Sequence, residues 1–273
     1  MMNLLFSIDD RFYRQMLTTL LSIHLNSQPQ RIDVYVIYNG QFHHEGVLKR
    51  GIQKLGMTFH PVRIPRDDFV NAPVTDRYPT TIYYRLLAHK YLPADLDRIL
   101  YLDADILCIN DLQPLYETDL SRYMYASAIH TNLTNVTETI NKIRLQNFDA
   151  DGYYNSGVLL MNLPKIRQRV HAQDIFDYLR NHLVLLPDQD VLNALYGDQI
   201  LSVPDQLYNF DCRNLAIYQT ISLGEWTLDW VMKHTVLLHY CGREKPWLTT
   251  VNHGRLTALY KNYYQMANRY LKD

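Results

Sequence analysis

Two aspartates separated by one residue, Asp103 and Asp105, lie in residues 98–109, the most apolar segment of the sequence. We predict that this segment is one β-strand. If the backbone stays extended through the pair, both carboxylates point the same way. Bare carboxylates side by side repel and raise each other's pKa unless a cation lies between them. Their oxygen atoms suit Mn²⁺ or Mg²⁺, so we predict a divalent-metal site, although an acidic pair can also simply end a strand in a turn.

A histidine at the end of another apolar segment could complete this site. His239 closes residues 236–239 and is followed by Gly242 and Lys245. An imidazole nitrogen added to two carboxylates would favour Mn²⁺ over Mg²⁺. Gly242 would let the backbone approach a ligand closely, and Lys245 would supply a point charge suited to phosphate. The alternative is a hydrogen-bonded core histidine with no ligand.

A different enzyme class also uses an Asp-x-Asp pair. Phosphatases of the haloacid-dehalogenase type place the pair after an apolar strand, with the first aspartate as nucleophile. In that class the pair normally follows the first strand, whereas here it occupies positions 103 and 105. A phosphatase acting on a phospho-sugar is therefore the second interpretation.

The segments that must position these residues alternate between strand and helix patterns. Apolar or β-branched runs predict strands at residues 3–8, 31–38, 59–64 and 154–161. Apolar residues at helical spacing predict helices from residue 12 and at residues 47–55, 80–92 and 165–183, with a shorter helix from about residue 188. After residue 198 the pattern is irregular until 236–239. This alternation predicts an α/β fold with a mainly parallel sheet, whose ligands bind where the strands end.

Composition narrows the class of protein. The chain has 273 residues, a net charge of -1 and 47% hydrophobic residues, which is ordinary for a globular protein and argues against a nucleic-acid partner. Its first residues do not resemble a signal peptide, and no window approaches a membrane span. The three cysteines, Cys108, Cys212 and Cys241, have no paired spacing. We therefore expect a cytoplasmic protein without a zinc framework.

Six segments in one order carry a family resemblance. They are residues 4–10 (LLFSIDD), 80–86 (TTIYYRL), 99–105 (ILYLDAD), 154–162 (YNSGVLLMN), 188–193 (DQDVLN) and 239–247 (HYCGREKPW). In these segments the chain resembles glycosyltransferase family eight, the bacterial lipopolysaccharide galactosyltransferases and glucosyltransferases, with glycogenin as a distant relative. The resemblance implies a GT-A fold with a Rossmann-like nucleotide-sugar domain at residues 1–250. It also implies retaining transfer from UDP-glucose or UDP-galactose to a hydroxyl group of a glycan or glycolipid.

The resemblance also assigns roles by position. It implies that Ser7, Ile8, Asp9 and Phe12 contact the nucleotide, with Phe12 at the position of a stacking tyrosine and Asp9 accepting from the uracil N–H. Asp103, Asp105 and His239 would hold Mn²⁺ or Mg²⁺, with Ala104 also at the donor, and Gly242 and Lys245 would contact the diphosphate. Arg85, Asn155, Ser156, Asp188 and Gln189 would hold the donor sugar.

Four of these residues, Arg85, Asp188, Gln189 and Lys245, would take part in catalysis. An amide oxygen is a poor nucleophile, so we assign Gln189 a positioning and electrostatic role, and we expect a phosphate oxygen of the leaving group to act as the base for the acceptor. A third interpretation is a UDP-sugar-binding protein without transfer activity.

Two further expectations concern the acceptor and the C-terminus. Residues 251–273 show apolar residues at helical spacing with basic residues between them, which predicts an amphipathic helix that either docks on the enzyme body or contacts the inner face of the membrane. His130 stands where the galactosyltransferases of the family have an aspartate. We expect this change to alter the acceptor pocket, unless His130 only packs under a neighbouring loop.

Overall fold

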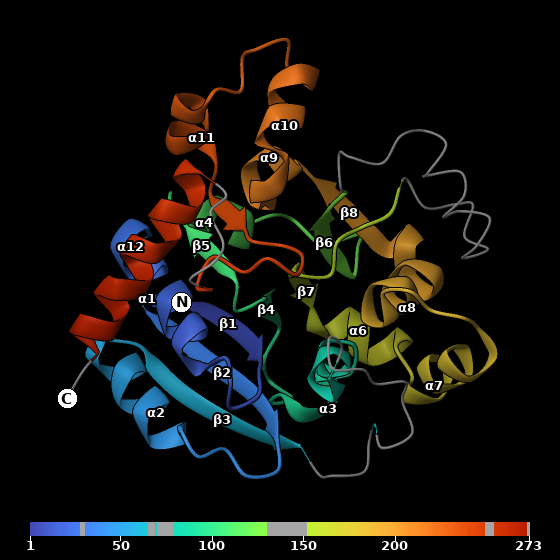
Figure 1. The fold of residues 1–273 in the computed structure, drawn as a ribbon. Helices are drawn as coiled ribbons and strands as arrows, with labels where there is room; N and C mark the ends of the chain where they lie inside the picture. Colours follow the sequence, from blue (N-terminus) through green and yellow to red (C-terminus); the bar gives the residue numbers. More distant parts are fainter. Residues whose placement is uncertain (28–30, 65–68, 70–78, 130–151, 249–253, 272–273) are drawn as a thin grey trace.

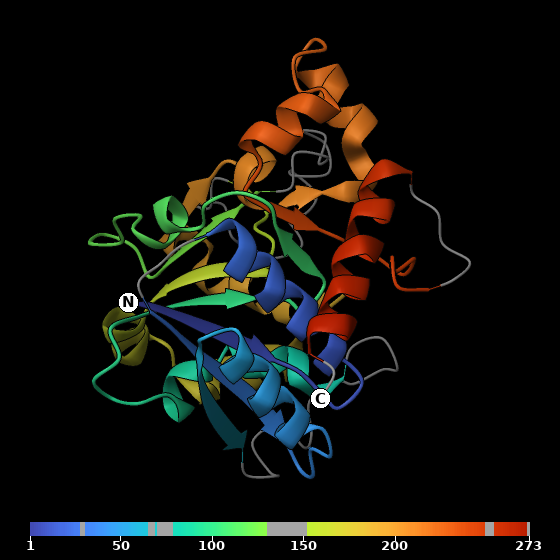
Figure 2. The same ribbon diagram turned by 90° about the vertical axis from the view of Figure 1, so that its left-hand side faces the viewer.

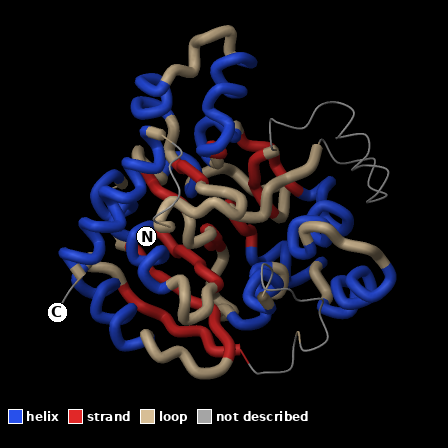
Figure 3. The backbone as a smooth tube through the Cα atoms, in the orientation of Figure 1, coloured by secondary structure: helices blue, strands red, loops and turns tan. Residues whose placement is uncertain are grey.

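A computed structural model describes residues 1–27, 31–64, 69, 79–129, 152–248 and 254–271. Among these residues the chain forms a seven-stranded sheet in the order β3-β2-β1-β4-β7-β6-β8 and a three-stranded sheet in the order β5-β10-β9. Helices cover both faces of the large sheet (Figures 1 and 3). The predicted α/β class, with a mostly parallel central sheet between helices, is confirmed.

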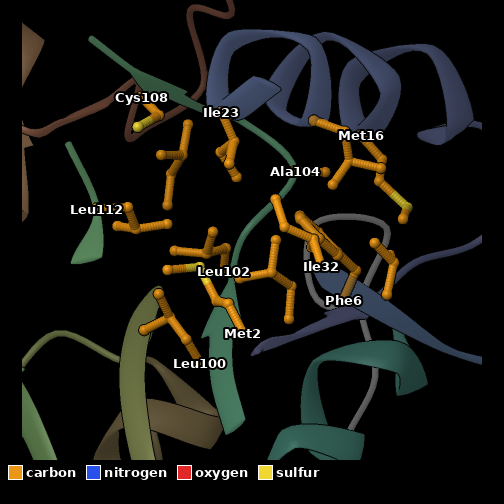
Figure 4. Packing of buried hydrophobic residues seen from close by; sticks show 14 of the residues in the cluster. Met2, Phe6, Met16, Ile23, Ile32, Leu100, Leu102, Ala104, Cys108 and Leu112 are labelled. Carbon is orange, nitrogen blue, oxygen red and sulfur yellow. The ribbon is translucent and has the colours of Figure 1, made fainter. Parts of the chain in front are cut away.

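The N-terminal half builds the parallel part of the large sheet. β1 (Met2–Ser7), β2 (Ile32–Asn39), β3 (Thr58–Ile64) and β4 (Arg98–Leu102) run parallel, linked on one side by α1 (Tyr13–Asn26) and α2 (Glu45–Lys54). Apolar residues of α1 pack onto β1 and β4 in one buried cluster, in which Met16, Phe6 and Leu100 are fully covered (Figure 4). The remaining strands, β6 (Tyr125–Ala128), β7 (Val158–Asn162) and β8 (Ile200–Val203), make the sheet mixed, because β7 runs antiparallel to both β4 and β6.

The prediction of one strand over residues 98–109 is wrong. The strand stops at Leu102, turns through residues 103–105, and continues as β5 (Ile106–Cys108) in the small sheet. Two buried hydroxyl groups of α1 hold this turn: Thr19 Oγ1 donates to the carbonyl oxygens of Ala104 and Ile106, at 3.2 and 2.7 Å, and Ser22 Oγ accepts from Cys108 N at 2.9 Å. Asp103 and Asp105 therefore lie in a turn directly after β4, at the junction of the two sheets, so the backbone is not extended through the pair and the alternative, that the acidic pair ends a strand in a turn, is confirmed.

Two predicted helices are also interrupted. Residues 80–92 form a 3₁₀ helix, η1 (Thr80–Arg85), and the short α3 (Ala88–Tyr91). Arg85 Nε donates to Ile82 O, the carbonyl that an α-helix would give to Leu86, and Leu86 N donates to Tyr83 O instead. Residues 165–183 divide into α6 (Leu163–Arg169) and α7 (Ala172–Asn181), because Val170 adopts an extended conformation and inserts into the core.

α8 (Pro187–Tyr196) confirms the short helix predicted from about residue 188, and β10 (Leu237–His239) confirms the strand predicted at residues 236–239. Between them lie regular elements that the sequence did not reveal, namely η2 (Gly197–Gln199), β8, α9 (Asp205–Tyr208), β9 (Phe210–Asp211), η3 (Cys212–Asn214), α10 (Leu215–Ile221) and α11 (Leu228–His234). These strands have two to four residues, too few to produce a recognisable alternation. α10 and α11 project from the end of the molecule opposite β3 (Figures 1 and 2), and α4 (Gln113–Tyr116) follows β5.

The C-terminal helix packs against the rest of the chain. α12 (Arg255–Tyr270) lies beside α1 in both ribbon views (Figures 1 and 2) and buries Leu256, Thr257, Tyr260 and Ala267. Those residues are therefore not available for the membrane surface that was the alternative expectation. Among the helices described, none combines the length and apolar character that a membrane crossing requires.

Candidate active site

The two aspartates and the histidine converge because of strand register. β10 pairs antiparallel with β5 so that His239 lies opposite Ile106, and Tyr240 N donates to Asp105 O at 3.0 Å. His239 Nε2 is 3.3 Å from Asp105 Oδ1 and 3.9 Å from Asp103 Oδ2. The three side chains offer ligand atoms that all lie within 4.8 Å of one another. This spacing, with one nitrogen and two carboxylates, suits a divalent cation such as Mn²⁺.

A glycine makes room for this cluster. Gly157 O accepts from Asp103 N at 2.8 Å, which holds the two segments together. A Cβ atom at Gly157 would lie 2.5 Å from His239 Cε1, 2.8 Å from Asp103 Oδ2 and 3.0 Å from Asn155 Oδ1. These distances are far below ordinary contact, so the cluster depends on the missing side chain.

Two cationic side chains partner the carboxylates. Arg85 places NH2 at 2.9 Å from Asp103 Oδ1 and Nε at 3.3 Å from Asp188 Oδ2, and its guanidinium lies over the Tyr101 ring, 4.4 Å from the ring centre. Lys245 Nζ pairs with Asp105 Oδ2 and donates to Tyr240 O at 3.0 Å. The repulsion expected between two bare carboxylates is therefore already offset by charges of the chain itself.

Burial and pairing oppose each other in the pKa values of these groups. Burial raises the pKa of Asp105, but Lys245 and His239 lower it more, so it lies well below its usual range. Burial lowers the pKa of Lys245, and Asp105 reverses the effect and raises it. The pKa of Asp188 is raised, because burial outweighs the stabilisation of the carboxylate by Arg85 and Ser156. Lys245 and Asp105 are thus a charged pair at neutral pH.

The residues predicted to hold the donor sugar also come together. α8 starts with Pro187, whose fixed φ suits a first helical position, and Asp190 Oδ2 accepts from Leu185 N at 2.7 Å. This start places Asp188 and Gln189 in the first turn of α8. The contacts are then Ser156 Oγ to Asp188 Oδ2 at 2.7 Å, Arg85 NH1 to Ser156 O at 2.9 Å, and Asn155 Nδ2 to Gln189 Oε1 at 3.2 Å.

The residues predicted to contact the nucleotide lie where β1 ends. Since Leu5 is opposite Tyr101 in the parallel pair β1 and β4, Ser7 reaches the same edge of the sheet as Asp103. Ser7 Oγ donates to Thr81 O at 2.6 Å, and Ile8 is buried. The nucleotide and metal segments therefore share one sheet edge, as the strand order predicts.

Asp9 and Phe12 have partners that the sequence did not indicate. Arg11 donates to both oxygens of the Asp9 carboxylate, with NH2 at 2.6 Å from Oδ2. Phe12 packs edge-on against Trp247, with ring centres 6.1 Å apart, and Lys245 Nζ lies 5.8 Å from the centre of the Trp247 ring. Trp247 thus links Phe12 to Lys245.

Ala104 and Gly242 both lie in closely packed surroundings. The methyl group of Ala104 is part of the buried cluster between α1 and β4 (Figure 4). Gly242 has φ of 88°, and a Cβ atom there would lie 2.6 Å from Arg213 NH1. His130 lies outside the described residues.

Sequence reasoning missed Tyr101 and Asn209. Tyr101 OH donates to Asp103 Oδ1 at 2.6 Å, and Asn209 Oδ1 lies 2.7 Å from His239 Nδ1. A tyrosine inside an otherwise aliphatic strand was a signal for the first. Asn209 stands alone between Tyr208 and Phe210, in a region without a recognisable pattern.

Comparison with known proteins agrees with this arrangement. Residues 3–251 match the sequence profile of glycosyl transferase family 8. The chain is 31% identical over 201 residues to a lipopolysaccharide 1,2-glucosyltransferase of Escherichia coli, covering 71% of this chain and 57% of that relative. It is 29% identical over 254 residues to the lipopolysaccharide 1,2-glucosyltransferase of Escherichia coli strain K12, covering 90% and 72%. The chain thus spans little more than half of the first relative's length.

Solved structures show the same fold. The galactosyltransferase LgtC, in complex with donor and acceptor sugar analogs, superposes with a TM-score of 0.80 at 24% identity, over 98% of this chain and 96% of that one. The glycosyltransferase GlyE of Streptococcus pneumoniae superposes with a TM-score of 0.70 at 22% identity, over 99% and 62%.

Proposed function

Because the chain belongs to glycosyl transferase family 8, we propose that it transfers glucose or galactose from a UDP-sugar to a hydroxyl group of a glycan or glycolipid, with retention of configuration and with Mn²⁺. The observation that carries the proposal is the convergence of Asp103, Asp105 and His239 within 4.8 Å. Two relatives are named lipopolysaccharide glucosyltransferases, which is the basis for the acceptor class. Residues 1–250 would form the transferase domain, and residues 251–273 its C-terminal helix.

Asp103, Asp105 and His239 would hold the ion. When bound, Mn²⁺ supplies Lewis-acid stabilisation of the negative charge that develops on the UDP leaving group. Mg²⁺ is the alternative ion, and the nitrogen ligand is the reason for preferring Mn²⁺.

Lys245 and Arg85 have different electrostatic roles in this proposal. Lys245 would exchange Asp105 for the diphosphate of the donor and stabilise the charge that forms there, because its ammonium is a mobile point charge. Arg85 is buried and bridges Asp103 and Asp188, so it would hold both carboxylates in place. Gly242 would bring backbone close to the same phosphates.

The donor would lie along the edge defined by β1 and β4. Ser7, Ile8, Asp9 and Phe12 would contact the uridine, and Asp9 would have to release Arg11 to accept from the uracil N–H. On the sugar side, Asn155, Ser156 and Asp188 would orient the hexose.

Gln189 would position the sugar and would not bond to it covalently. Its Oε1 already accepts from Asn155 Nδ2 at 3.2 Å and Ser156 N at 3.4 Å. The acceptor hydroxyl would attack on the face that UDP leaves, and a phosphate oxygen of UDP would take its proton.

The test measures UDP release from UDP-glucose and UDP-galactose with Mn²⁺, with Mn²⁺ plus EDTA, and with Mg²⁺. We expect turnover that EDTA abolishes; turnover unaffected by EDTA would refute the metal assignment. NMR of the product tests retention, since an inverted anomeric configuration contradicts it. A melting-temperature screen with UDP-glucose, UDP-galactose and UDP-N-acetylglucosamine identifies the donor. Release of inorganic phosphate from a phospho-sugar, or donor binding without turnover, would support one of the two alternative interpretations instead.

A further inference from the structure

Four buried side chains form a line of hydrogen bonds from the sugar residues to the metal cluster. Gln189 Oε1 accepts from Asn155 Nδ2 at 3.2 Å, Asn155 Oδ1 accepts from Asn209 Nδ2 at 2.8 Å, and Asn209 Oδ1 lies 2.7 Å from His239 Nδ1. All four residues are at least nine-tenths buried. Asn209, which immediately precedes β9, contacts both Asn155, among the sugar residues, and His239, in the metal cluster.

Two backbone amides fix the direction of this line. Gly157 N–H donates to the side chain of Asn155 at 2.9 Å, and Ser156 N–H donates to that of Gln189 at 3.4 Å. A backbone N–H can only donate, so the atoms that face it are Asn155 Oδ1 and Gln189 Oε1. The amide group of Asn155 therefore has its oxygen towards Asn209 and its nitrogen towards Gln189.

The orientation of Asn155 determines the next two groups. Because Asn155 presents an oxygen, Asn209 must present Nδ2 to it and Oδ1 to His239. An amide oxygen only accepts, so the hydrogen of a neutral His239 ring lies on Nδ1. The lone pair of the ring is then on Nε2, the nitrogen that faces Asp103 and Asp105.

We propose that Asn209 is a positioning residue that fixes His239 for metal binding and, through Asn155, fixes the amide of Gln189 beside the donor sugar. The inference rests on the proposed function, because it concerns the metal and sugar sites of that reaction. Asn209, which lies outside the assigned motifs, would thus fix the side-chain orientations at both the metal site and the sugar site.

Two substitutions distinguish the link from Asn209 to His239 from the link through Asn155 to Gln189. Asn209→Leu removes both hydrogen bonds. Asn209→Asp keeps an oxygen for His239 Nδ1 but turns a second oxygen towards Asn155 Oδ1, which has no hydrogen to share. The control is Asn3→Leu, which removes a buried amide bonded to Tyr116 and Arg98 at the opposite end of β1.

The first measurement is the Mn²⁺ dissociation constant without donor, from the EPR signal of free Mn²⁺. We expect Asn209→Leu to weaken binding by about 10- to 100-fold, as substitutions behind a ligating histidine do. Asn209→Asp should bind as tightly as wild type or more tightly, and Asn3→Leu as wild type. Wild-type affinity in Asn209→Leu, or an equal loss in Asn209→Asp, would overturn the proposal. Asn209→Ala takes the place of Asn209→Leu if the latter does not fold.

The second measurement is steady-state UDP release at saturating Mn²⁺. We expect kcat to fall in both Asn209 variants, because both disturb Asn155 and Gln189, and to persist in Asn3→Leu. Unchanged kcat in Asn209→Asp would refute the claim that Asn209 fixes Gln189 through Asn155. If the wild-type protein itself binds no Mn²⁺ or releases no UDP, the proposed function fails; if only the variants behave as wild type, this inference alone fails.

Discussion

Gly157 offers the sharpest test of how the site is packed. In a Gly157→Ala variant the new methyl carbon would lie 2.5 Å from His239 Cε1 and 2.8 Å from Asp103 Oδ2. Carbon atoms in contact are normally about 3.5–4.0 Å apart, so the ring must move by roughly 1 Å. Neither neighbour moves freely, because His239 is bonded to Asn209 and Asp103 to Tyr101 and Arg85.

Overpacking of this kind costs about 1–3 kcal/mol. For a chain of this size that corresponds to a melting temperature lower by roughly 2–10 °C. The displaced ligands should weaken Mn²⁺ binding by about 10-fold or more and reduce transfer accordingly. The φ of Gly157 is not in the left-handed region, so the effect is steric and does not come from backbone strain.

The matched control is Gly46→Ala in α2. Its added methyl would meet only Arg50 NH1, at 3.6 Å, so it should leave Mn²⁺ binding unchanged and stabilise the helix by about 0.5–1 kcal/mol. The assays are thermal unfolding followed by circular dichroism, Mn²⁺ titration by EPR, and UDP release. If Gly157→Ala binds Mn²⁺ and transfers sugar as wild type does, the reasoning from close packing is wrong.

Three further predictions concern stability. Leu223 has φ of 53° and is 95% exposed at the end of α10, so Leu223→Gly should raise the free energy of unfolding by about 1 kcal/mol in denaturant titrations. Asp105→Asn should lower the free energy of unfolding of the metal-free protein by roughly 1–3 kcal/mol, because it leaves the partly buried Lys245 without its carboxylate. The double variant Asp105→Asn/Lys245→Met should recover part of this loss, whereas a higher melting temperature in the single variant would mean that repulsion from Asp103 dominates. Burial lowers the pKa of His89 from 6.5 to about 4, so the folded state binds fewer protons than the unfolded state between these values. The free energy of unfolding should therefore fall by about 1–2 kcal/mol, after allowance for the partly exposed ring, as the pH drops from 6.5 towards 4, and should level off below. In His89→Gln, measured over the same pH series, this part of the pH dependence should be missing.

The sequence predicted the elements whose pattern lies within one short segment, and it missed the features that depend on contacts between distant segments. The alternating strands and helices of the first 64 residues appear where expected, because each has several residues of consistent period. The break at residues 103–105 could not be found in this way. Both flanking segments are apolar, and the hydroxyls of Thr19 and Ser22 that hold the turn come from a helix more than 80 positions earlier in the chain.

The residues of the candidate site also divide into those that the sequence indicated and those that only the structure revealed. Asp103, Asp105 and His239 could be grouped in advance because each follows an apolar segment and their side chains together suit a divalent cation. Asn209 was not, because a lone asparagine has no chemical signature. Its proposed role depends on two backbone amides, at Ser156 and Gly157, that set the direction of the side-chain amides between them and the imidazole. Residue types thus indicate which atoms can bind a metal. The hydrogen-bond donors fixed by the backbone determine how those atoms are oriented, and these donors come close to the side chains only in the folded chain.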